Sequence, residues 1–289
     1  MIRDVTLELV RNCNLKCGFC FIPHELKRND NVMSWDVIRS SLDFAEKAKV
    51  FAVILGGGEP FLHPRLMDAV VEARRKLFAT YVTTNLTIPI SEEELDLLRR
   101  VGAVMKFTIY GFSFEQFHRV TGGSEVSWRN FVTNIEKLLE HGIKAHIMIM
   151  PDEGNGWLLG LRKEELSETF QRALERYPTT VIMSRFPDWF GRIASEPPWK
   201  DGGSRPDLMN EDPLVYDNIL SVPSVKANCI ISHFPRVYVT YDGTVYPCPG
   251  SPEVLGHISK IAPELIKEKI CKGLPWYGGR CSILFSYVF

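Results

Sequence analysis

The chain has 289 residues, more than the ~100 to 200 typical of one domain, so one large α/β domain or a domain with an appendage is expected. Its 45% hydrophobic and 24% charged residues are ordinary for a soluble globular protein with a sizeable core. A formal net charge of -1 argues against a surface built for nucleic-acid phosphates. No segment approaches the ~18 apolar residues of a membrane span, and residues 1–10 lack a signal peptide's apolar core. We therefore expect a cytoplasmic protein with no nucleic-acid or membrane partner.

Strand and helix patterns alternate through most of the chain. Strands are predicted at residues 4–10, 50–57, 79–85, 104–110, 144–150 and 179–186, and helices at 34–49, 63–77, 91–102, 127–142 and 163–177. Ser34 and Ser91 are N-cap candidates, and Gly102 is a C-cap candidate. The alternation predicts parallel βαβ units, in an open sheet or a barrel, with ligands at the carboxyl ends of the strands.

The regular pattern stops near residue 187. Residues 187–223 are rich in Pro, Gly and Trp, which indicates a loop over the mouth of the sheet or a bridge to an appendage. Residues 236–248 then alternate around Asp242-Gly243, the pair preferred in type I′ turns. They predict a β-hairpin.

The seven cysteines lie at the two ends of the sequence: Cys13, Cys17 and Cys20, then Cys229, Cys248, Cys271 and Cys281. Cytoplasmic thiols stay reduced, so metal ligands are favoured over disulfides. The first three form a C-x3-C-x2-C motif without a fourth cysteine nearby. Structural zinc normally takes four ligands, whereas a [4Fe-4S] cluster on three thiolates leaves one iron open to a ligand. The cluster is favoured; a zinc site and a chance group of buried thiols are the alternatives.

This motif, with the aromatic Phe19 before its last cysteine, resembles that of the radical S-adenosylmethionine (SAM) enzymes. "GGGEP" at residues 56–60 resembles the family's glycine-rich turn, whose backbone takes the methionine amino group of SAM. An ordinary strand-to-helix turn is the alternative. The resemblance implies that polar groups at the next strand ends face the ribose and carboxylate of SAM, although Asn85 is equally interpreted as a helix or turn cap. The implied cofactor-binding residues are Phe19, Gly56, Gly57, Gly58, Glu59, Thr84, Asn85 and Tyr110.

Residues 110–123 resemble a "YG…HD…TG" passage of peptide-modifying members of the family. Arg119 stands where an acidic residue often follows the histidine. His118 is therefore interpreted as a helix-face histidine sooner than as a site residue.

The later cysteines resemble the auxiliary-cluster appendage called SPASM or, when short, twitch. Cys229, Gly243 and Cys248 match the first half of that pattern, but the dense cysteine run of a full SPASM domain is missing. The resemblance implies one auxiliary [4Fe-4S] cluster, the second in the protein, on Cys229, Cys248, Cys271 and Cys281. Two alternatives remain: Cys271 or Cys281 is a free thiol that gives a hydrogen atom to a substrate radical, or the four cysteines form a zinc knuckle.

The resemblance implies a partial (β/α)6 TIM-like barrel core (1–190), an irregular bridge (191–225) and a SPASM/twitch-like domain with a β-hairpin (226–289). It also implies reductive cleavage of SAM to a 5′-deoxyadenosyl radical that abstracts hydrogen from a substrate. A reductant such as ferredoxin or flavodoxin would supply the electron.

Oxidative modification or maturation of a peptide or protein is the favoured function. A small-molecule dehydrogenase or epimerase of the twitch type, and a non-enzymatic two-cluster electron carrier or zinc-binding module, are the alternatives. Only twelve residues precede Cys13, so we expect no amino-terminal leader-binding domain. The barrel or a partner would then recognise a peptide.

Overall fold

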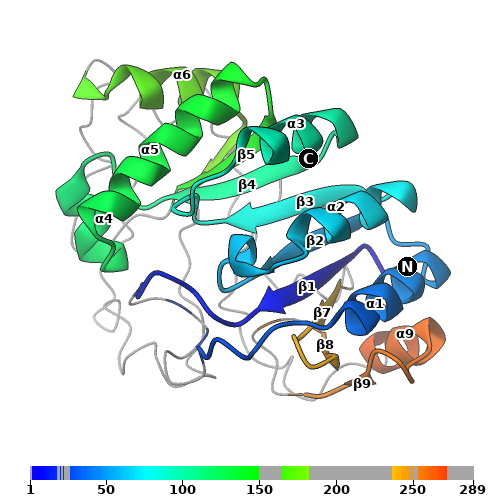
Figure 1. Ribbon diagram of the computed structural model, residues 1–289. Coiled ribbons are helices and arrows are strands. Elements are labelled where there is room, and N and C mark those ends of the chain that lie inside the picture. The colour runs from blue at the N-terminus through cyan, green and yellow to red at the C-terminus, as the bar shows by residue number, and fades with distance from the viewer. Residues whose placement is uncertain are drawn as a thin grey trace, which may run out of the picture.

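A nine-stranded sheet organises the part of the chain described by the computed structural model, which comprises residues 2–17, 20, 22, 27–149, 165–181, 236–247, 249 and 253–271. Its strand order is β6-β5-β4-β3-β2-β1-β7-β8-β9 (Figure 1). The strands are β1 (Asp4–Val10), β2 (Ala52–Gly57), β3 (Ala79–Thr84), β4 (Val104–Ile109), β5 (Lys144–Ile149), β6 (Thr179–Val181), β7 (Arg236–Val239), β8 (Thr244–Tyr246) and β9 (Gly256–His257). Neighbours from β6 to β7 are parallel, and β8 and β9 are antiparallel. The predicted α/β fold is confirmed, and the sheet is not closed.

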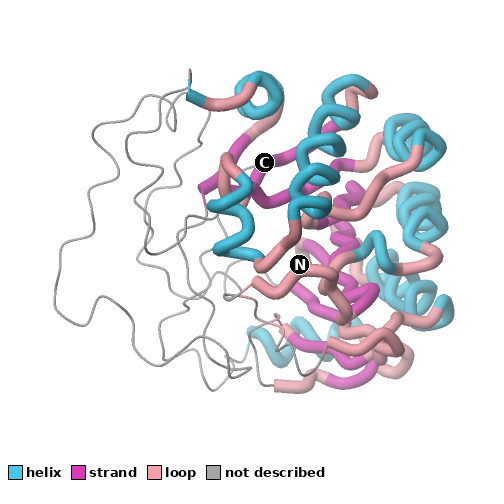
Figure 2. The backbone as a smooth tube through the Cα atoms, turned by 60° about the vertical axis from the view of Figure 1, so that its left-hand side comes forward, coloured by secondary structure: helices cyan, strands magenta, loops and turns pink. Residues whose placement is uncertain are grey.

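Helices lie along one face of this sheet, as Figures 1 and 2 show. They are α1 (Trp35–Lys47), α2 (Leu66–Arg75), α3 (Glu92–Val101), α4 (Phe114–Thr121), α5 (Glu125–Glu140), α6 (Glu168–Arg176) and α9 (Pro263–Cys271), with the short 3-10 helix η2 (Pro60–Leu62). Alternate strand residues such as Leu7, Leu55 and Phe107 are buried in one core with helix residues such as Leu42 and Phe131. Burial of these side chains fixes the strand register, because a one-residue slip would turn the apolar side chains to the other face. No helix in the described ranges is both long and apolar enough to cross a bilayer.

The three predicted helix caps are those of the structure. Ser34 Oγ accepts from the backbone N–H of Val37 at the start of α1. Ser91 and Glu94 form a reciprocal capping box on α3, and Gly102 ends that helix with a left-handed φ of 67°. Local sequence signals therefore predict where α1 begins and where α3 begins and ends.

Two local features differ from the sequence prediction. No bounds were predicted for helix α4, whose eight residues were interpreted as part of a site passage, although His118 within it was interpreted as a helix-face histidine. The hairpin β7–β8 is present, but its turn is not type I′. Asp242 has no positive φ, and only Gly243 does, at 87°. The Gly243 N–H bonds to Thr240 O and the Thr240 N–H to Thr244 O, as in a three-residue loop with a glycine bulge.

The carboxy-terminal hairpin joins the main sheet directly. Strand β7 pairs in parallel with β1, with Asp4 opposite Arg236, and these two side chains form an ion pair of 3.3 Å. The hairpin thus continues the sheet on the far side of β1 from β2. The division at residues 190 and 225 stays a prediction, and the bridge between these positions lies outside the described residues.

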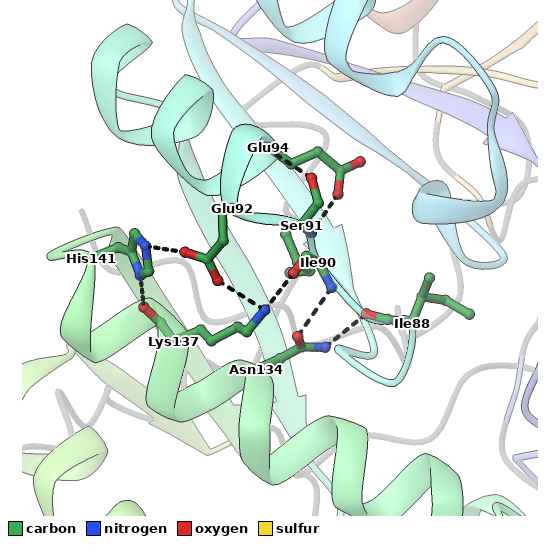
Figure 3. A network of polar contacts seen from close by, with 8 residues as sticks. All are labelled: Ile88, Ile90, Ser91, Glu92, Glu94, Asn134, Lys137 and His141. Carbon is green, nitrogen blue, oxygen red and sulfur yellow. Dashed lines mark hydrogen bonds and ion pairs between the residues drawn. The ribbon is translucent and has the colours of Figure 1, made fainter.

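The loop between β3 and α3 is held by one buried side chain of α5. Asn134 Nδ2 donates to Ile88 O at 2.7 Å, and Asn134 Oδ1 accepts from the Ile90 N–H at 3.2 Å (Figure 3). Asn134 Nδ2 also donates to Leu86 O at 2.7 Å. Beside it, Lys137 donates to Ile90 O and pairs with Glu92. These bonds satisfy backbone groups that have no partner in a strand or helix, so the loop keeps one conformation.

We expect Asn134→Ala to lower the free energy of unfolding by about 2–4 kcal/mol, because three backbone groups lose their partner at a buried site. Urea denaturation followed by circular dichroism measures this loss. The control is Glu92→Gln, which breaks more exposed ion pairs with Lys137 and His141 and should cost clearly less than Asn134→Ala. Equal losses in the two variants would contradict the assignment.

Candidate active site at the carboxyl ends of the strands

The amino-terminal cysteine loop begins where β1 ends. In Figure 1 the arrowheads of β1 and β3 point to the side where this dark blue loop and α4 lie. The pairing of β1 with β2 shifts register between Glu8 and Val10, and a bulge of this kind redirects the chain beside a site. The loop places Cys17 in a buried position and leaves Cys13 and Cys20 half-buried. All three are free thiols.

An apolar and aromatic cover surrounds these thiols. Cys17 packs in one cluster with Leu15 and Phe117, and Tyr110 and Trp128 border it. Phe117 comes from α4, and its ring centroid lies 5.5 Å from that of Trp128 on α5. The Lys16 N–H donates to Thr121 O at 2.8 Å, which ties the loop to the end of α4. Helix α4 therefore helps to shape the site that the cysteines occupy.

The surroundings of the cysteine loop disfavour the charged thiolate form of Cys13 and Cys17. Burial raises the pKa of Cys13 to about 11, and the nearby Glu59 adds to this; burial also raises the pKa of Cys17, with Cys13 and Cys20 adding to it. A coordinating metal deprotonates such thiols outright. Three ligands of a single zinc ion would lie about 3.8 Å apart, given ~2.3 Å zinc–sulfur bonds at tetrahedral angles. No three His, Cys, Asp or Glu side chains in the described ranges form a group that could hold one ion. Three free thiols on one loop are the donor type that a [4Fe-4S] cluster takes.

The glycine turn after β2 lies directly against the cysteine loop. The Gly58 N–H donates to Val10 O at 2.7 Å, and the Glu59 N–H donates to Asn12 O at 2.9 Å. A Cβ on Gly57, whose φ is 126°, would overlap Val10 O, and one on Gly58 would overlap Asn12 O. Glycine is required here because backbone meets backbone. Gly56 has no such constraint, since a Cβ there would make ordinary contact with Thr83.

The carboxylate of Glu59 joins this turn to the end of β3. It is fully buried and accepts from Phe61 N at 3.1 Å, Thr84 Oγ1 at 2.7 Å and Asn85 N at 2.7 Å. Burial raises the pKa of Glu59 to about 7, and the donated hydrogen bonds lower it. Thr84 donates its hydroxyl hydrogen to Glu59 and accepts from the Leu86 N–H. The sequence assigned Glu59 and Thr84 to SAM; in the structure their polar atoms bind one another.

Asn85, also assigned to SAM, lies beside the first cysteine. Its Nδ2 is 3.6 Å from Cys13 Sγ and 3.0 Å from Asn14 Oδ1. Its Oδ1 accepts from Thr87 N at 2.8 Å and from Thr87 Oγ1 at 2.6 Å. The side chain therefore closes a turn, as the capping interpretation expected, and at the same time reaches the cysteine loop.

The remaining predicted site residues divide into two groups. Tyr110 follows β4 and borders the three thiols; burial, and next the charge of Cys17, raise its pKa well above the ordinary value. His118 lies on α4, and its Nδ1 is 2.7 Å from Gly123 O, so it caps a turn as the helix-face interpretation expected. Phe19, Cys229, Cys248, Cys281 and the loop at 187–223 lie outside the described residues, as does the side chain of Cys271.

A buried ion pair that the sequence did not reveal lies at the start of the cysteine loop. Glu8 is 1% exposed, and its carboxylate accepts from Arg11 Nε at 2.6 Å and Arg11 Nη2 at 3.0 Å. The guanidinium also lies 4.8 Å from the centroid of the Tyr241 ring. Because Tyr241 belongs to the turn after β7, Arg11 links the cysteine loop to the carboxy-terminal hairpin.

A second missed group lies on the sheet face opposite the helices. Lys106 on β4 is buried, with its Nζ 4.1 Å from the centroid of the Tyr81 ring on β3. Burial lowers the pKa of Lys106 to about 8, while Asp4 on β1 raises it. Burial, and then the charge of Lys106, lower the pKa of His146 on β5 to about 4. The only sequence signal was the alternation in each strand, which places these polar residues away from the core.

Comparison with known proteins identifies the family of this chain. The sequence profile described as the radical SAM superfamily matches residues 7–163, more than half of the chain. The chain belongs to the radical SAM superfamily. Enzymes of this superfamily use a [4Fe-4S] cluster and SAM.

Individual relatives cover parts of this radical SAM chain. It is 38% identical over 98 residues to a tungsten-containing aldehyde ferredoxin oxidoreductase cofactor-modifying protein of Pyrococcus furiosus, over 33% of this chain and 27% of that protein. It is 27% identical over 156 residues to the antilisterial bacteriocin subtilosin biosynthesis protein AlbA of Bacillus subtilis, over 53% of this chain and 34% of AlbA. The aligned segments therefore span about a third of these relatives. In fold it resembles Streptococcus suis SuiB bound to the precursor peptide SuiA, with a TM-score of 0.65, 16% identity, and coverage of 98% of this chain and 67% of SuiB.

We expect Glu59→Gln to lower the free energy of unfolding by about 1–3 kcal/mol. Both carboxylate oxygens of Glu59 accept hydrogen bonds from Phe61, Thr84 or Asn85, and in the variant the glutamine NH2 group would replace one of these acceptors and face a donor. Urea denaturation of the cluster-free protein measures this loss. Glu94→Gln makes the same substitution at a half-buried position on the helix surface, where the carboxylate accepts from one backbone N–H, and should cost no more than about 1 kcal/mol. A Glu59→Gln protein as stable as wild type would contradict the network.

Proposed function

We propose that Cys13, Cys17 and Cys20 hold a [4Fe-4S] cluster whose open iron takes SAM, and that the chain oxidatively modifies a peptide or protein. The observation that carries this proposal is the meeting of the three free thiols with the glycine turn and Asn85 at the carboxyl ends of β1, β2 and β3. Ligands bind at this edge of parallel α/β sheets. The aromatic cover of Cys17 would keep water from the cluster.

In this proposal the chain's residues bind, orient and exclude water, and the cofactors supply the hard chemistry. When bound, the cluster gives one electron that cleaves SAM into methionine and a 5′-deoxyadenosyl radical, which takes a hydrogen atom from the substrate. The backbone of Gly57 and Gly58 lies against the cysteine loop, and the backbone of the turn from Gly56 to Gly58 would receive the methionine amino group. Tyr110 and Phe19 would border the bound cofactor, and Glu59 and Thr84 would hold the turn and the end of β3 in place. A reductant such as ferredoxin or flavodoxin would deliver the electron.

A peptide or protein is the proposed substrate class. Two similar proteins support it by name: AlbA is a bacteriocin biosynthesis protein, and SuiB was solved with a precursor peptide. The direct pairing of β7 with β1 supports a second metal site close to the first, because the hairpin that leads to Cys248 lies in the same sheet as β1, which leads into the cysteine loop. We propose that Cys229, Cys248, Cys271 and Cys281 hold an auxiliary cluster that accepts the electron left by oxidation of the substrate.

Anaerobic reconstitution should yield about eight irons per chain, since each [4Fe-4S] cluster contributes four. With dithionite the protein should convert SAM to 5′-deoxyadenosine. Replacing Cys13, Cys17 or Cys20 by Ala should remove about four irons and reduce that conversion at least a hundredfold. Iron analysis and liquid chromatography measure the two quantities.

Cys271→Ser and Cys281→Ser are the matched controls at the other end of the chain. Each should lower the stability of the auxiliary cluster and leave SAM cleavage in place. Loss of substrate turnover at full iron content would instead identify that cysteine as a hydrogen-atom donor. Zinc in the purified protein, with no 5′-deoxyadenosine formed, would contradict the proposed function.

The substrate class is testable with the short peptides encoded beside the gene. With SAM and dithionite, a true substrate should accelerate 5′-deoxyadenosine formation and lose about two mass units per oxidation, the mass of two hydrogen atoms, which mass spectrometry detects. A scrambled peptide of the same composition is the control. Activity on small alcohols or sugars, with none on any neighbouring peptide, would favour the dehydrogenase alternative.

A further inference from the structure

Asn85 is oriented so that its amide hydrogens face the cysteine loop. The Thr87 backbone N–H can only donate, so the Asn85 atom 2.8 Å from it must be the oxygen. The Thr87 hydroxyl donates to the same oxygen and accepts from Asn14 Nδ2 at 2.7 Å. The Asn85 NH2 group therefore points the other way, toward Cys13 Sγ and Asn14 Oδ1.

These contacts form a closed ring of donors and acceptors. Asn14 donates to Thr87, Thr87 donates to Asn85, and Asn85 donates back to Asn14. Each step has one direction, and a flipped Asn85 amide would set two oxygens against each other at Asn14 and two donors against each other at Thr87. The second Nδ2 hydrogen of Asn85 remains for Cys13 Sγ.

The backbone of Asn85 is fixed as well. Its N–H donates to the buried Glu59 carboxylate at 2.7 Å, and its side chain is among the buried polar groups, at 6% exposure. Asn130 on α5 donates to Thr87 O at 3.1 Å and supports the same turn from the other side. The 3.6 Å contact to sulfur is thus set by bonds to Asn85 itself from the glycine turn, from Thr87 and from the cysteine loop.

Cys13 is the one cysteine for which the described structure gives two N–H donors on the sulfur. The second donor is the Leu15 N–H at 3.5 Å. Hydrogen bonds to the sulfurs set the reduction potential of an iron–sulfur cluster, because each N–H dipole stabilises the more negative, reduced state. A donor at Cys13 Sγ therefore favours acceptance of the electron that SAM cleavage needs.

We propose that Asn85 acts through Cys13 as a positioning residue that raises the reduction potential of the cluster, and that it is not a contact of SAM. The inference rests on the proposed function, since it needs Cys13 as a cluster ligand. Asn14, Thr87 and Glu59 serve to hold the Asn85 amide in the orientation that donates to sulfur.

The test is an EPR-monitored redox titration of the reconstituted full chain without SAM. The signal that changes on later addition of SAM identifies the amino-terminal cluster. Asn85→Leu and the smaller Asn85→Ser should each lower the equilibrium constant for reduction at least threefold. For a one-electron couple this is a shift of about 30 mV to more negative potential, since tenfold is 59 mV. The dissociation constant of SAM should stay within twofold of wild type.

Asn130→Ala is the matched control, because it loosens the same turn without removing the donor to Cys13. It should keep the wild-type potential. Thr87→Val removes the lock on the amide and should shift the potential in the same direction as Asn85→Leu, by a smaller amount. A further measurement needs no substitution: pulsed EPR of wild-type protein labelled with side-chain amide 15N asparagine should show nitrogen coupled to the cluster.

The outcomes separate the two proposals. If Asn85→Leu and Asn85→Ser keep the wild-type potential, or weaken SAM binding several-fold without changing it, the inference is overturned and Asn85 is a contact of SAM or of the fold alone. If neither variant holds a cluster, absence of 15N coupling in the wild-type protein overturns it. If Cys13→Ala retains the SAM-sensitive signal, the proposed function itself fails.

Discussion

The buried carboxylate of Glu59 is the interaction on which the candidate site depends. It lies at the end of β2, and it accepts from the backbone of its own turn and from both residues at the end of β3. Three donors around one buried carboxylate are costly to separate, since each would lose a charge-assisted hydrogen bond away from water. The two strand ends are therefore held as one unit, and the cysteine loop is bonded to that unit through the backbone of Val10 and Asn12.

This arrangement changes the interpretation of the motif residues. A glycine-rich turn beside a cofactor suggests close approach to a ligand, but Gly57 and Gly58 are needed first for close approach to the cysteine loop. Glu59 and Thr84 similarly have their polar atoms bound to each other. The turn thus positions the three thiols before any ligand arrives, which is how preorganised sites reduce the cost of binding.

Much of the fold was predictable because its signals are local. Helix caps such as Ser91 and Gly102, and strands with one apolar face such as residues 4–10, are recognisable within a short window of sequence. The cysteine motif is equally local. The features that the sequence did not reveal have distant partners: Asn85 with Cys13, Asn134 with the loop after β3, and Arg11 with Tyr241. The hairpin turn shows the same limit on a small scale, because an Asp-Gly pair is compatible with more than one turn and the bonds of Thr240 decide between them.

The parallel pairing of β1 with β7 also has a consequence for how the protein is made. The two strands are more than two hundred residues apart in sequence, and contacts at such separation form late and slowly. Until β7 arrives, one edge of β1 offers unpaired backbone groups to other chains, a known route to aggregation. The cysteine loop follows β1 directly, and Tyr241, which stacks on its Arg11, lies beyond β7. A ribosome must therefore release most of the polypeptide before this loop is bordered on that side, so the loop reaches its final surroundings only late in synthesis.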